Sequence, residues 1–224
     1  MREIVPTTSI AVRDRIRDDI VAGALPLGSR LTLESLAARY SVGHMPVREA
    51  LLQLQGEGLV VLTPNRGARV RAVDIAFVRN VFDLRMAIEA MLARRAAERI
   101  DARGIARLEA TQAQYEAKAA ARDYAALLAI NREFHSIICD AADNCEAAAV
   151  LDRHRRLIAA LWMLYGYGED RIAGVISDHR HIIAALAAHE ADVAASLAMA
   201  HAAKAKQALI ARMIDKESVA SNAA

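Results

Sequence analysis

Residues 41–54 read SVGHMPVREALLQL, and this stretch decides the fold of the first third of the chain. Val47, Leu51 and Leu54 recur at i, i+4 and i+7, which places them on one face of a helix. Pro46 fits the first turn of that helix, where its missing N–H would have no intrahelical partner. The sequence therefore predicts a short turn followed by a helix with an apolar back.

The other face of this helix is polar, because His44, Arg48 and Gln55 fall largely off the apolar stripe. A helix with a buried back and a basic, hydrogen-bonding front suits reading of the DNA major groove. The alternative is an amphipathic helix whose polar face meets only solvent. The helix alone does not decide between these two, so its neighbours matter.

The composition indicates an intracellular globular protein. The chain has 224 residues, 55% of them hydrophobic and only 4% aromatic, so a core is expected to form from aliphatic helix faces. Cys139 and Cys145 are too few for a disulfide scaffold and lack C-x-x-C spacing, which favours a reducing cytosol. No signal-peptide region and no apolar run of membrane-spanning length is present. We expect a soluble, cytoplasmic protein with no membrane partner.

The basic residues are unevenly distributed. Residues 1–72 carry ten arginines, no lysine and seven acidic residues, an excess of three positive charges, whereas residues 73–224 have an excess of one negative charge. This distribution suggests that the first part meets a phosphate-bearing partner.

The first part is predicted to contain three helices and a hairpin. The expected elements are a helix over 10–22 capped by Ser9, a helix over 33–40 started by Thr32, the helix of the opening stretch ending at 56–58, and strands over 59–62 and 68–71. Arg66 lies near the tip of this two-stranded hairpin. Helices followed by a wing form a winged helix-turn-helix plan, and an arginine at the wing tip can reach phosphate or the minor groove. The alternative is an exposed arginine with no function.

Several motifs in this part resemble the DNA-binding domain of GntR-type bacterial transcription regulators, over about residues 8–72. They are LPLGSRL at 25–31, MPVREAL at 45–51, GEGLV at 56–60 and NRGARV at 65–70. The resemblance implies that Arg48 contacts the DNA backbone and that the wing tip at Arg66 and Gly67 enters the minor groove. The DNA-binding residues expected from it are Thr32, His44, Met45, Pro46, Arg48, Arg66, Gly67 and Arg69.

Two positions depart from that family. This chain has Gly43 where the family usually has Ser or Thr, and His44 where it usually has Arg. The hydroxyl that often contacts phosphate is therefore missing, and a shorter, mostly neutral group replaces a base-reading arginine. We expect DNA binding with a different operator sequence.

The second part is predicted to be all helical. The expected helices cover 75–100 after a cap at Asp74, 105–121, 123–141, 145–165 after a cap at Asn144, 169–189 and 191–214, with Asp101 and Gly104 separating the first two and a frayed tail at 215–224. The fold class is thus mainly α, with a winged helix-turn-helix domain at 1–72 and an all-α six-helix bundle at 73–224.

Histidines carry the chemistry of the bundle. Asn131 and His135 are four residues apart and share a helix face, while His179 and His201 belong to two other helices. Three imidazoles that converge could bind a divalent metal such as Zn²⁺ or Ni²⁺. The alternative is a set of scattered surface histidines, and His154, His181 and His189 are assigned to it.

Four further motifs resemble the effector-binding FCD domain of the FadR branch, over about residues 75–212. They are DLRMAIE at 83–89, NREFHSII at 131–138, DHRHIIAAL at 178–186 and MAH at 199–201. The resemblance implies that Asn131, His135, His179 and His201 ligate the metal, which helps to hold a small organic acid. Arg85 would then pair with a carboxylate of that acid, the alternative being an intrahelical pair with Glu89.

Within that resemblance, Asn131 is a neutral ligand, weaker than the Asp of many relatives. Branch members that bind acyl-CoA lack the histidine set, so its presence argues against that ligand.

Three functions remain open from the sequence. The first is a ligand-responsive transcription regulator, expected to be a repressor and a homodimer on a palindromic operator. The second is a helical metalloenzyme acting on small carboxylates, but paired E-x-x-H motifs, H-E-x-x-H and an evident general base are all missing from the sequence. The third is a structural helical module without a ligand. We predict the first and expect no enzyme activity.

Overall fold

A computed structural model describes residues 8–63 and 67–222 of the chain. This described part contains nine helices and three short strands, so the predicted mainly α fold class is confirmed. Contacts divide the chain into two compact units, one of residues 1–74 with 153–164 and one of residues 75–152 with 165–224.

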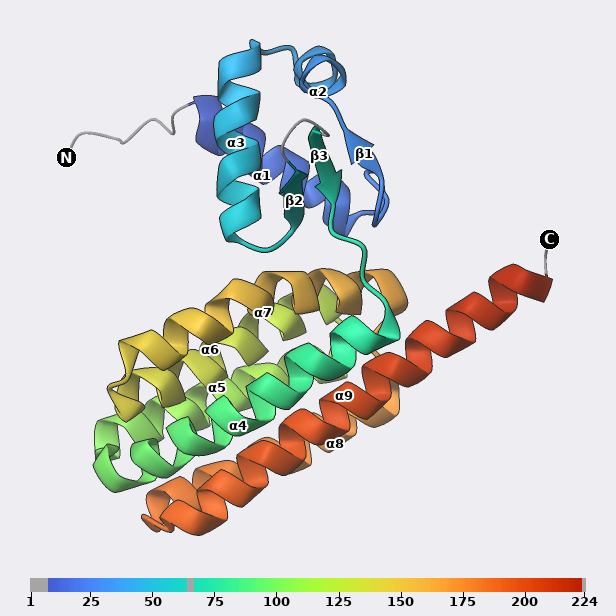
Figure 1. The fold of residues 1–224 in the computed structure, drawn as a ribbon. Coiled ribbons are helices and arrows are strands. Elements are labelled where there is room, and N and C mark those ends of the chain that lie inside the picture. The colour runs from blue at the N-terminus through green and yellow to red at the C-terminus, as the bar shows by residue number, and fades with distance from the viewer. Residues whose placement is uncertain (1–7, 64–66, 223–224) are drawn as a thin grey trace. The chain divides into compact units, whose positions relative to one another are not determined.

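The N-terminal unit is a winged helix-turn-helix. It contains α1 (Thr8–Val21), α2 (Leu33–Tyr40), α3 (His44–Gly56) and an antiparallel sheet of β1 (Arg30–Leu31), β2 (Val60–Thr63) and β3 (Gly67–Val70), in the order β1-β3-β2 (Figure 1). The predicted hairpin is β2–β3, and β1 adds a third strand that the sequence did not indicate. A strand of two residues is too short to produce an alternating pattern.

The back of α3 forms the centre of this unit. Val47, Ala50, Leu51 and Leu54 are all buried, and they pack with the buried face of α1. The turn before α3 is tight because Ser41 adopts a left-handed conformation with φ of 56°. The apolar stripe predicted for the opening stretch is therefore the core face of α3.

Two details at the starts of helices test the predicted caps. Thr32 caps α2 as expected, since its side chain accepts a hydrogen bond from the backbone N–H of Ser35 at 3.1 Å. The predicted cap at Ser9 is wrong: α1 already includes Thr8, and Ser9 lies buried inside the helix. The wing tip at 64–66, and with it Arg66, lies outside the described residues.

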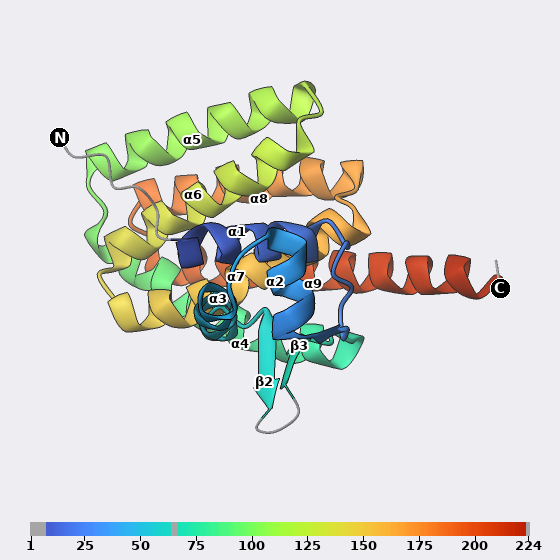
Figure 2. The same ribbon diagram turned by 90° about the horizontal axis from the view of Figure 1, so that it is seen from above.

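The helical unit consists of α4 (Ile75–Arg99), α5 (Ala102–Ala120), α6 (Tyr124–Ala142), α7 (Cys145–Tyr165), α8 (Glu169–Ala187) and α9 (Ala191–Asn222). α7 is divided between the two units at residue 152. α4 and α9 lie side by side, and α5 forms an edge beside α6 and α8 (Figure 2). Leu92, Phe134, Ile182 and Leu186 lie at the centre of the main apolar core.

Side-chain caps start three of these helices. The side chains of Asp101, Asp123 and Asn144 each accept a hydrogen bond from the backbone N–H three residues on. The cap at Asn144 confirms the prediction. Gly104 does not separate helices as predicted, because the cap at Asp101 starts α5 early and places Gly104 in its first turn.

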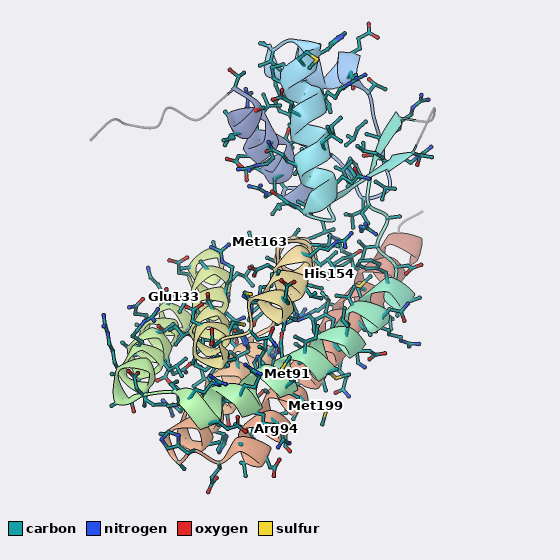
Figure 3. All side chains as sticks on the ribbon, turned by 60° about the vertical axis from the view of Figure 1, so that its left-hand side comes forward. Met91, Arg94, Glu133, His154, Met163 and Met199 are labelled. Carbon is teal, nitrogen blue, oxygen red and sulfur yellow. The ribbon has the colours of Figure 1, made fainter. Side chains whose placement is uncertain are left out.

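The prediction of a frayed tail from residue 215 is wrong over the described part, since α9 continues to Asn222. Extending a helix that has already formed adds about one hydrogen bond per residue fixed, so the helix can continue through a polar segment that includes weak helix formers such as Asp215, Ser218 and Asn222. Nearer its start, α9 is joined to α4 by an ion pair between Asp192 and Arg94. Figure 3 labels Arg94 on α4. No helix of the described residues is both long and apolar enough to cross a membrane.

Candidate functional site

The front of α3 presents the residues expected to contact DNA. His44, Met45 and Arg48 are exposed, and Pro46 is half-buried in the first turn. Gly43 caps the helix without a side-chain hydrogen bond. Backbone N–H groups at the start of α3 are therefore not occupied by a capping side chain, an arrangement that favours an anion such as a phosphate.

A groove of 890 Å³ lies beside α3 within the N-terminal unit. Its lining includes four of the predicted DNA-binding residues, Thr32, His44, Arg48 and Gly67. They come from the start of α2, from α3 and from the start of β3. The fold thus brings together residues up to 35 positions apart in the sequence.

Sequence reasoning missed Arg30, which also lines this groove. In the sheet Arg30 of β1 lies opposite Arg69 of β3, and both are exposed. The guanidinium of Arg69 donates a hydrogen bond to the carbonyl of Gly28 at 3.2 Å. The only signal for Arg30 was its place between the turn at Gly28 and the cap at Thr32.

The three histidines singled out in the bundle converge. His135 of α6, His179 of α8 and His201 of α9 each offer a ring nitrogen, and these nitrogens all lie within 4.8 Å of one another. His179 and His201 are buried and His135 is half-buried. The three imidazoles could therefore hold one metal ion.

Hydrogen bonds on the far side of His179 set its tautomer. Nδ1 of His179 lies 2.9 Å from Oε1 of Gln112, and Nε2 of Gln112 donates to Glu116 at 2.8 Å. Because Glu116 takes the amide N–H, the amide oxygen faces His179 and must accept from Nδ1–H. This leaves a lone pair on Nε2, a buried atom with no hydrogen-bond partner among the described residues.

His201 is held in the same way by a carboxylate. Its Nδ1 lies 3.2 Å from Oδ2 of Asp178, whose other oxygen accepts from Lys204 at 2.5 Å. Burial would raise the pKa of Asp178, but hydrogen bonds from His201 and Lys204 outweigh it and hold that pKa well below its ordinary value. Such a carboxylate behind a histidine orients the ring and makes it a better metal ligand. Asp178 and Gln112 were both missed from the sequence.

Burial keeps these imidazoles neutral. It lowers the pKa of His179 well below its ordinary value, with the neighbouring charges of His201, His135 and Arg171 acting in the same direction. Burial also lowers the pKa of His201, against the opposing effect of Asp178. A neutral imidazole is the form that binds metal, so the environment suits that purpose.

Two neighbours complete the cluster. Asn131 lies one turn before His135 on α6, and its side-chain oxygen is buried without a hydrogen-bond partner among the described residues. The ring of Phe134 stacks on His179, with ring centres 3.8 Å apart and planes 3° apart. An orphaned oxygen donor beside three converging imidazoles is a donor set that fits a divalent cation of the Zn²⁺ or Ni²⁺ type.

Arg85 forms the intrahelical pair that the sequence left as an alternative. Its Nε and Nη2 both donate to Oε1 of Glu89, at 3.0 and 2.8 Å, and both side chains are largely buried. Oε2 of Glu89 is buried and has no partner among the described residues. A role of Arg85 toward an effector is left as a prediction.

The remaining histidines of the bundle do not join the cluster. His181 is exposed, and Nδ1 of His189 lies 2.7 Å from the carbonyl oxygen of Ala97. His154 is half-buried on α7.

Both parts of the chain match known sequence families. The family of bacterial regulatory proteins called gntR matches residues 8–70, and the FCD domain family matches residues 80–204, more than half of the chain. The chain belongs to the GntR family. Its N-terminal match covers the winged helix-turn-helix, and its FCD match covers every residue of the histidine cluster.

Individual relatives of this GntR-family chain are also named as transcription regulators. The HTH-type transcriptional repressor RspR of Escherichia coli K12 is 32% identical over 133 residues, which cover 59% of this chain and 58% of RspR. The chain thus spans less than two thirds of the length of RspR. The Nta operon transcriptional regulator of Aminobacter aminovorans is 27% identical over 178 residues, 79% of this chain and 82% of that protein.

A solved structure of McbR/YncC from E. coli shares the fold, with a TM-score of 0.73 at 19% identity over 95% of this chain and all of that one. The family and these named relatives are transcription regulators, so the expectation that the chain is not an enzyme is confirmed at family level. The metalloenzyme alternative has no support.

Proposed function

We propose that this GntR-family chain is a ligand-responsive transcription regulator whose helical domain binds a divalent metal and a small organic acid. One observation carries the proposal: the chain joins a winged helix with an exposed, basic groove to a bundle in which three imidazoles converge. The first feature suits DNA and the second suits a small ligand. RspR is named a repressor, which supports the same direction of regulation for this chain.

In this proposal a homodimer places two copies of α3 on a palindromic operator, since two-fold symmetry of the protein matches that of the site. Arg48 contacts a phosphate beside the major groove. The wing, with Arg66, Gly67 and Arg69, lies against the neighbouring minor groove or backbone. Arg30, opposite Arg69 in the sheet, adds to the same basic surface.

In the bundle, Asn131, His135, His179 and His201 would hold the cation, Zn²⁺ or Ni²⁺. When bound, the cation supplies a concentrated positive charge that attracts an acid oxygen. Gln112 and Asp178 orient two of these ligands in advance, by hydrogen bonds to Nδ1 of His179 and of His201.

Arg85 is proposed to meet the carboxylate of the acid. Its guanidinium uses only Nε and Nη2 toward Glu89 in the bonds described above, so a planar fork can be shared with a second carboxylate. We place the division between the two domains at residues 72–73, which lie between the two family matches. The acid then alters operator affinity by favouring one arrangement of the domains about the joint at 72–74, which requires different affinities for the two arrangements.

Two measurements test this function. A thermal-shift screen of small carboxylic acids, with and without Zn²⁺ or Ni²⁺, should find acids that raise the melting temperature only when the metal is present. Gel-shift titration on the DNA upstream of the chain's own gene should then show salt-sensitive, sequence-selective binding that such an acid changes. Binding that ignored DNA sequence would refute the regulator. If elemental analysis found no stoichiometric metal in the purified protein, the metal site would be refuted and the structural helical module without a ligand would be supported.

A further inference from the structure

Arg171 is a buried cation whose paired carboxylate lies beyond hydrogen-bond distance. It lies in the first turn of α8, only 9% exposed. Its Nη1 is 3.6 Å from Oδ2 of Asp178, its Nη2 donates to the carbonyl of His201 at 3.5 Å, and its Nε is buried with no partner among the described residues. By contrast, Arg180 on the same helix is exposed and forms two short bonds with Glu116, at 2.8 and 2.6 Å. The arginine that most needs a counter-charge has the weaker one.

Arg171 belongs to the same compartment as the histidine cluster. Its positive charge acts on both His179 and His201. Burial raises the pKa of Tyr167, and Arg171 opposes that rise through its charge and through a side-chain hydrogen bond, with the charge of Arg85 acting in the same direction. Helix geometry agrees, because residues 171, 175, 178 and 179 fall on one side of α8.

The carboxylates that could neutralise this compartment are already engaged. Oε1 of Glu89 accepts both bonds from Arg85. The oxygens of Asp178 face His201 and Lys204. The side chain of Lys204 is itself exposed, so the buried charges are two arginines and two carboxylates, which balance before any metal is bound.

The expected ligand set leaves the charge of a bound metal uncompensated. Asn131 is neutral and an imidazole binds metal in its neutral form, so a divalent cation held by these residues keeps its full charge of two. The compartment would then carry about two uncompensated positive charges at the cation, and the weakly paired Arg171 is a second place that attracts an anion. Uncompensated charge in a buried site is strongly unfavourable, and an anion that reaches both places relieves it.

We propose that Arg171 is a second anion-binding residue of this site, and that the ligand is a small dicarboxylate with one acid group at the histidine cluster and the other at Arg171. This inference rests on the proposed metal and organic-acid site and narrows the ligand class within it. In this inference Arg171 is the residue that selects dicarboxylates over monocarboxylates.

The experiment compares acids that differ in one carboxylate. Full-length protein is loaded with one equivalent of Zn²⁺ and dialysed, and calorimetric titration compares malonate, succinate, glutarate and adipate with the monocarboxylates of the same carbon number. Wild-type protein should bind at least one diacid about tenfold or more tightly than its monoacid, as expected for an additional charge-assisted contact. Inorganic phosphate, which has a single acid centre, should bind no more tightly than the monoacids.

Substitution of Arg171 identifies the residue responsible. Arg171→Met should reduce the diacid preference to about twofold or less, with bound Zn²⁺ and monoacid affinity unchanged, and Arg171→Lys should retain part of the preference. Arg122→Met is the control, since Arg122 is exposed and pairs only with Glu169 among the described residues. The melting temperature of ligand-free Arg171→Met should stay close to that of wild type, because Asp178 keeps its bonds with His201 and Lys204 when Arg171 is replaced by an apolar side chain of similar length.

The outcomes separate the two levels of proposal. Zn²⁺ bound with equal affinity for diacids and monoacids, or a diacid preference that survives Arg171→Met, would overturn the role of Arg171 and leave the proposed function standing. Absence of both Zn²⁺ and acid binding would overturn both. If Arg171→Met did not fold, Arg171 would have a structural role, and Arg171→Lys would provide the test. A full preference for diacids in Arg171→Lys would show that the guanidinium group is not what selects them.

Discussion

The two candidate sites, the groove beside α3 and the histidine cluster of the bundle, both contain histidine and arginine, but these side chains are exposed in one site and buried in the other. In the N-terminal unit, His44, Arg48 and Arg30 lie exposed around an open groove. In the bundle, His179 and His201 are buried and held by Gln112 and Asp178, and Arg171 is buried close to them. A phosphate backbone is long and hydrated, so it is met by side chains that keep their freedom until contact. A small ligand is met by groups fixed in advance.

The difference has a measurable consequence. Removing one residue from the open surface should weaken binding by a modest factor, since neighbouring contacts remain. Removing one from the enclosed cluster should abolish or nearly abolish binding, because the remaining donors are fixed and cannot rearrange. We therefore expect the largest effects in the bundle.

The largest effect is expected for His135→Ala. Loss of one of three imidazoles should reduce Zn²⁺ affinity by more than about 100-fold, because removal of even a residue behind a ligand lowers metal affinity about 10–100-fold. Elemental analysis after dialysis, with circular dichroism to verify folding, measures it. His181→Ala is the matched control, an exposed histidine two residues from His179. Stoichiometric metal in folded His135→Ala would remove His135 from the ligand set.

Gln112→Leu comes next, because it leaves every ligand present and removes only what holds His179. Without the acceptor at Nδ1, the ring loses its fixed tautomer and orientation, and Zn²⁺ affinity should fall about tenfold or more. A competition titration with a chromophoric chelator measures the change. Gln114→Leu, an exposed position on the same helix, should leave affinity unchanged. An equal loss in both variants would show that Gln112 acts through helix stability instead.

His44→Arg tests the open surface for sequence reading. An arginine can make a bidentate contact with guanine that the shorter imidazole cannot, worth about 1–3 kcal/mol of discrimination per base pair. Selection from randomised operators should therefore yield a different preferred sequence for the variant. His181→Arg is the control, because it makes the same substitution at an exposed histidine of the helical unit, outside the groove. An unchanged preference would make His44 a spacer at the start of α3.

Arg48→Ala should have a smaller and more uniform effect. Loss of one phosphate contact should weaken binding to all sequences alike, by about three- to tenfold, and should lower the slope of log affinity against log salt by about one. Fluorescence anisotropy at several salt concentrations measures both quantities, with Arg122→Ala in the bundle as control. A loss confined to one operator sequence would instead show that Arg48 reads a base.

The sequence predicted those parts of both sites that depend on spacing within one element. The i, i+4, i+7 stripe of Val47, Leu51 and Leu54 fixed which side of α3 is buried, and the i, i+4 pair of Asn131 and His135 fixed one side of the cluster. The convergence of His135 with His179 and His201 was indicated by family motifs, since periodicity cannot say which helix faces which.

The missed residues depend on tertiary structure. Gln112 is distant in sequence from His179, and nothing in its own helix marks it as a partner of a histidine. Arg30 belongs to a strand of two residues whose register with Arg69 only the sheet defines. Asp178 was visible in the motif at 178–186, but its function depends on α9 bringing His201 and Lys204 alongside. The tail of α9 differs for another reason. Its polar composition predicts fraying, whereas a helix that has already formed continues through it.

The smallest effect is expected for Tyr40→Phe, a substitution in the N-terminal unit outside the lining of the groove. There Tyr40 and Asp19 are paired by a hydrogen bond. The hydroxyl of Tyr40 donates to Oδ2 of Asp19 at 2.7 Å, and Arg39 donates to the same oxygen. The hydrogen bond from Tyr40 is the largest cause that lowers the pKa of Asp19. Tyr40→Phe should therefore reduce the free energy of unfolding by about 1 kcal/mol at pH 7.

The sign of the pH dependence follows from that shift. An Asp with a lowered pKa stabilises the folded state above its unfolded pKa of 3.8, and this stabilisation is lost as the pH falls through the folded value. The difference between wild type and Tyr40→Phe should thus be full at pH 7 and smaller at pH 3, measured by urea unfolding. At the alkaline end, burial raises the pKa of Tyr40 to about 12, so wild type should lose stability between pH 10 and 12 where Tyr40→Phe does not. Tyr124→Phe, at an exposed position, is the control. A difference that stayed constant across these pH values would mean that the hydroxyl contributes through packing and not through Asp19.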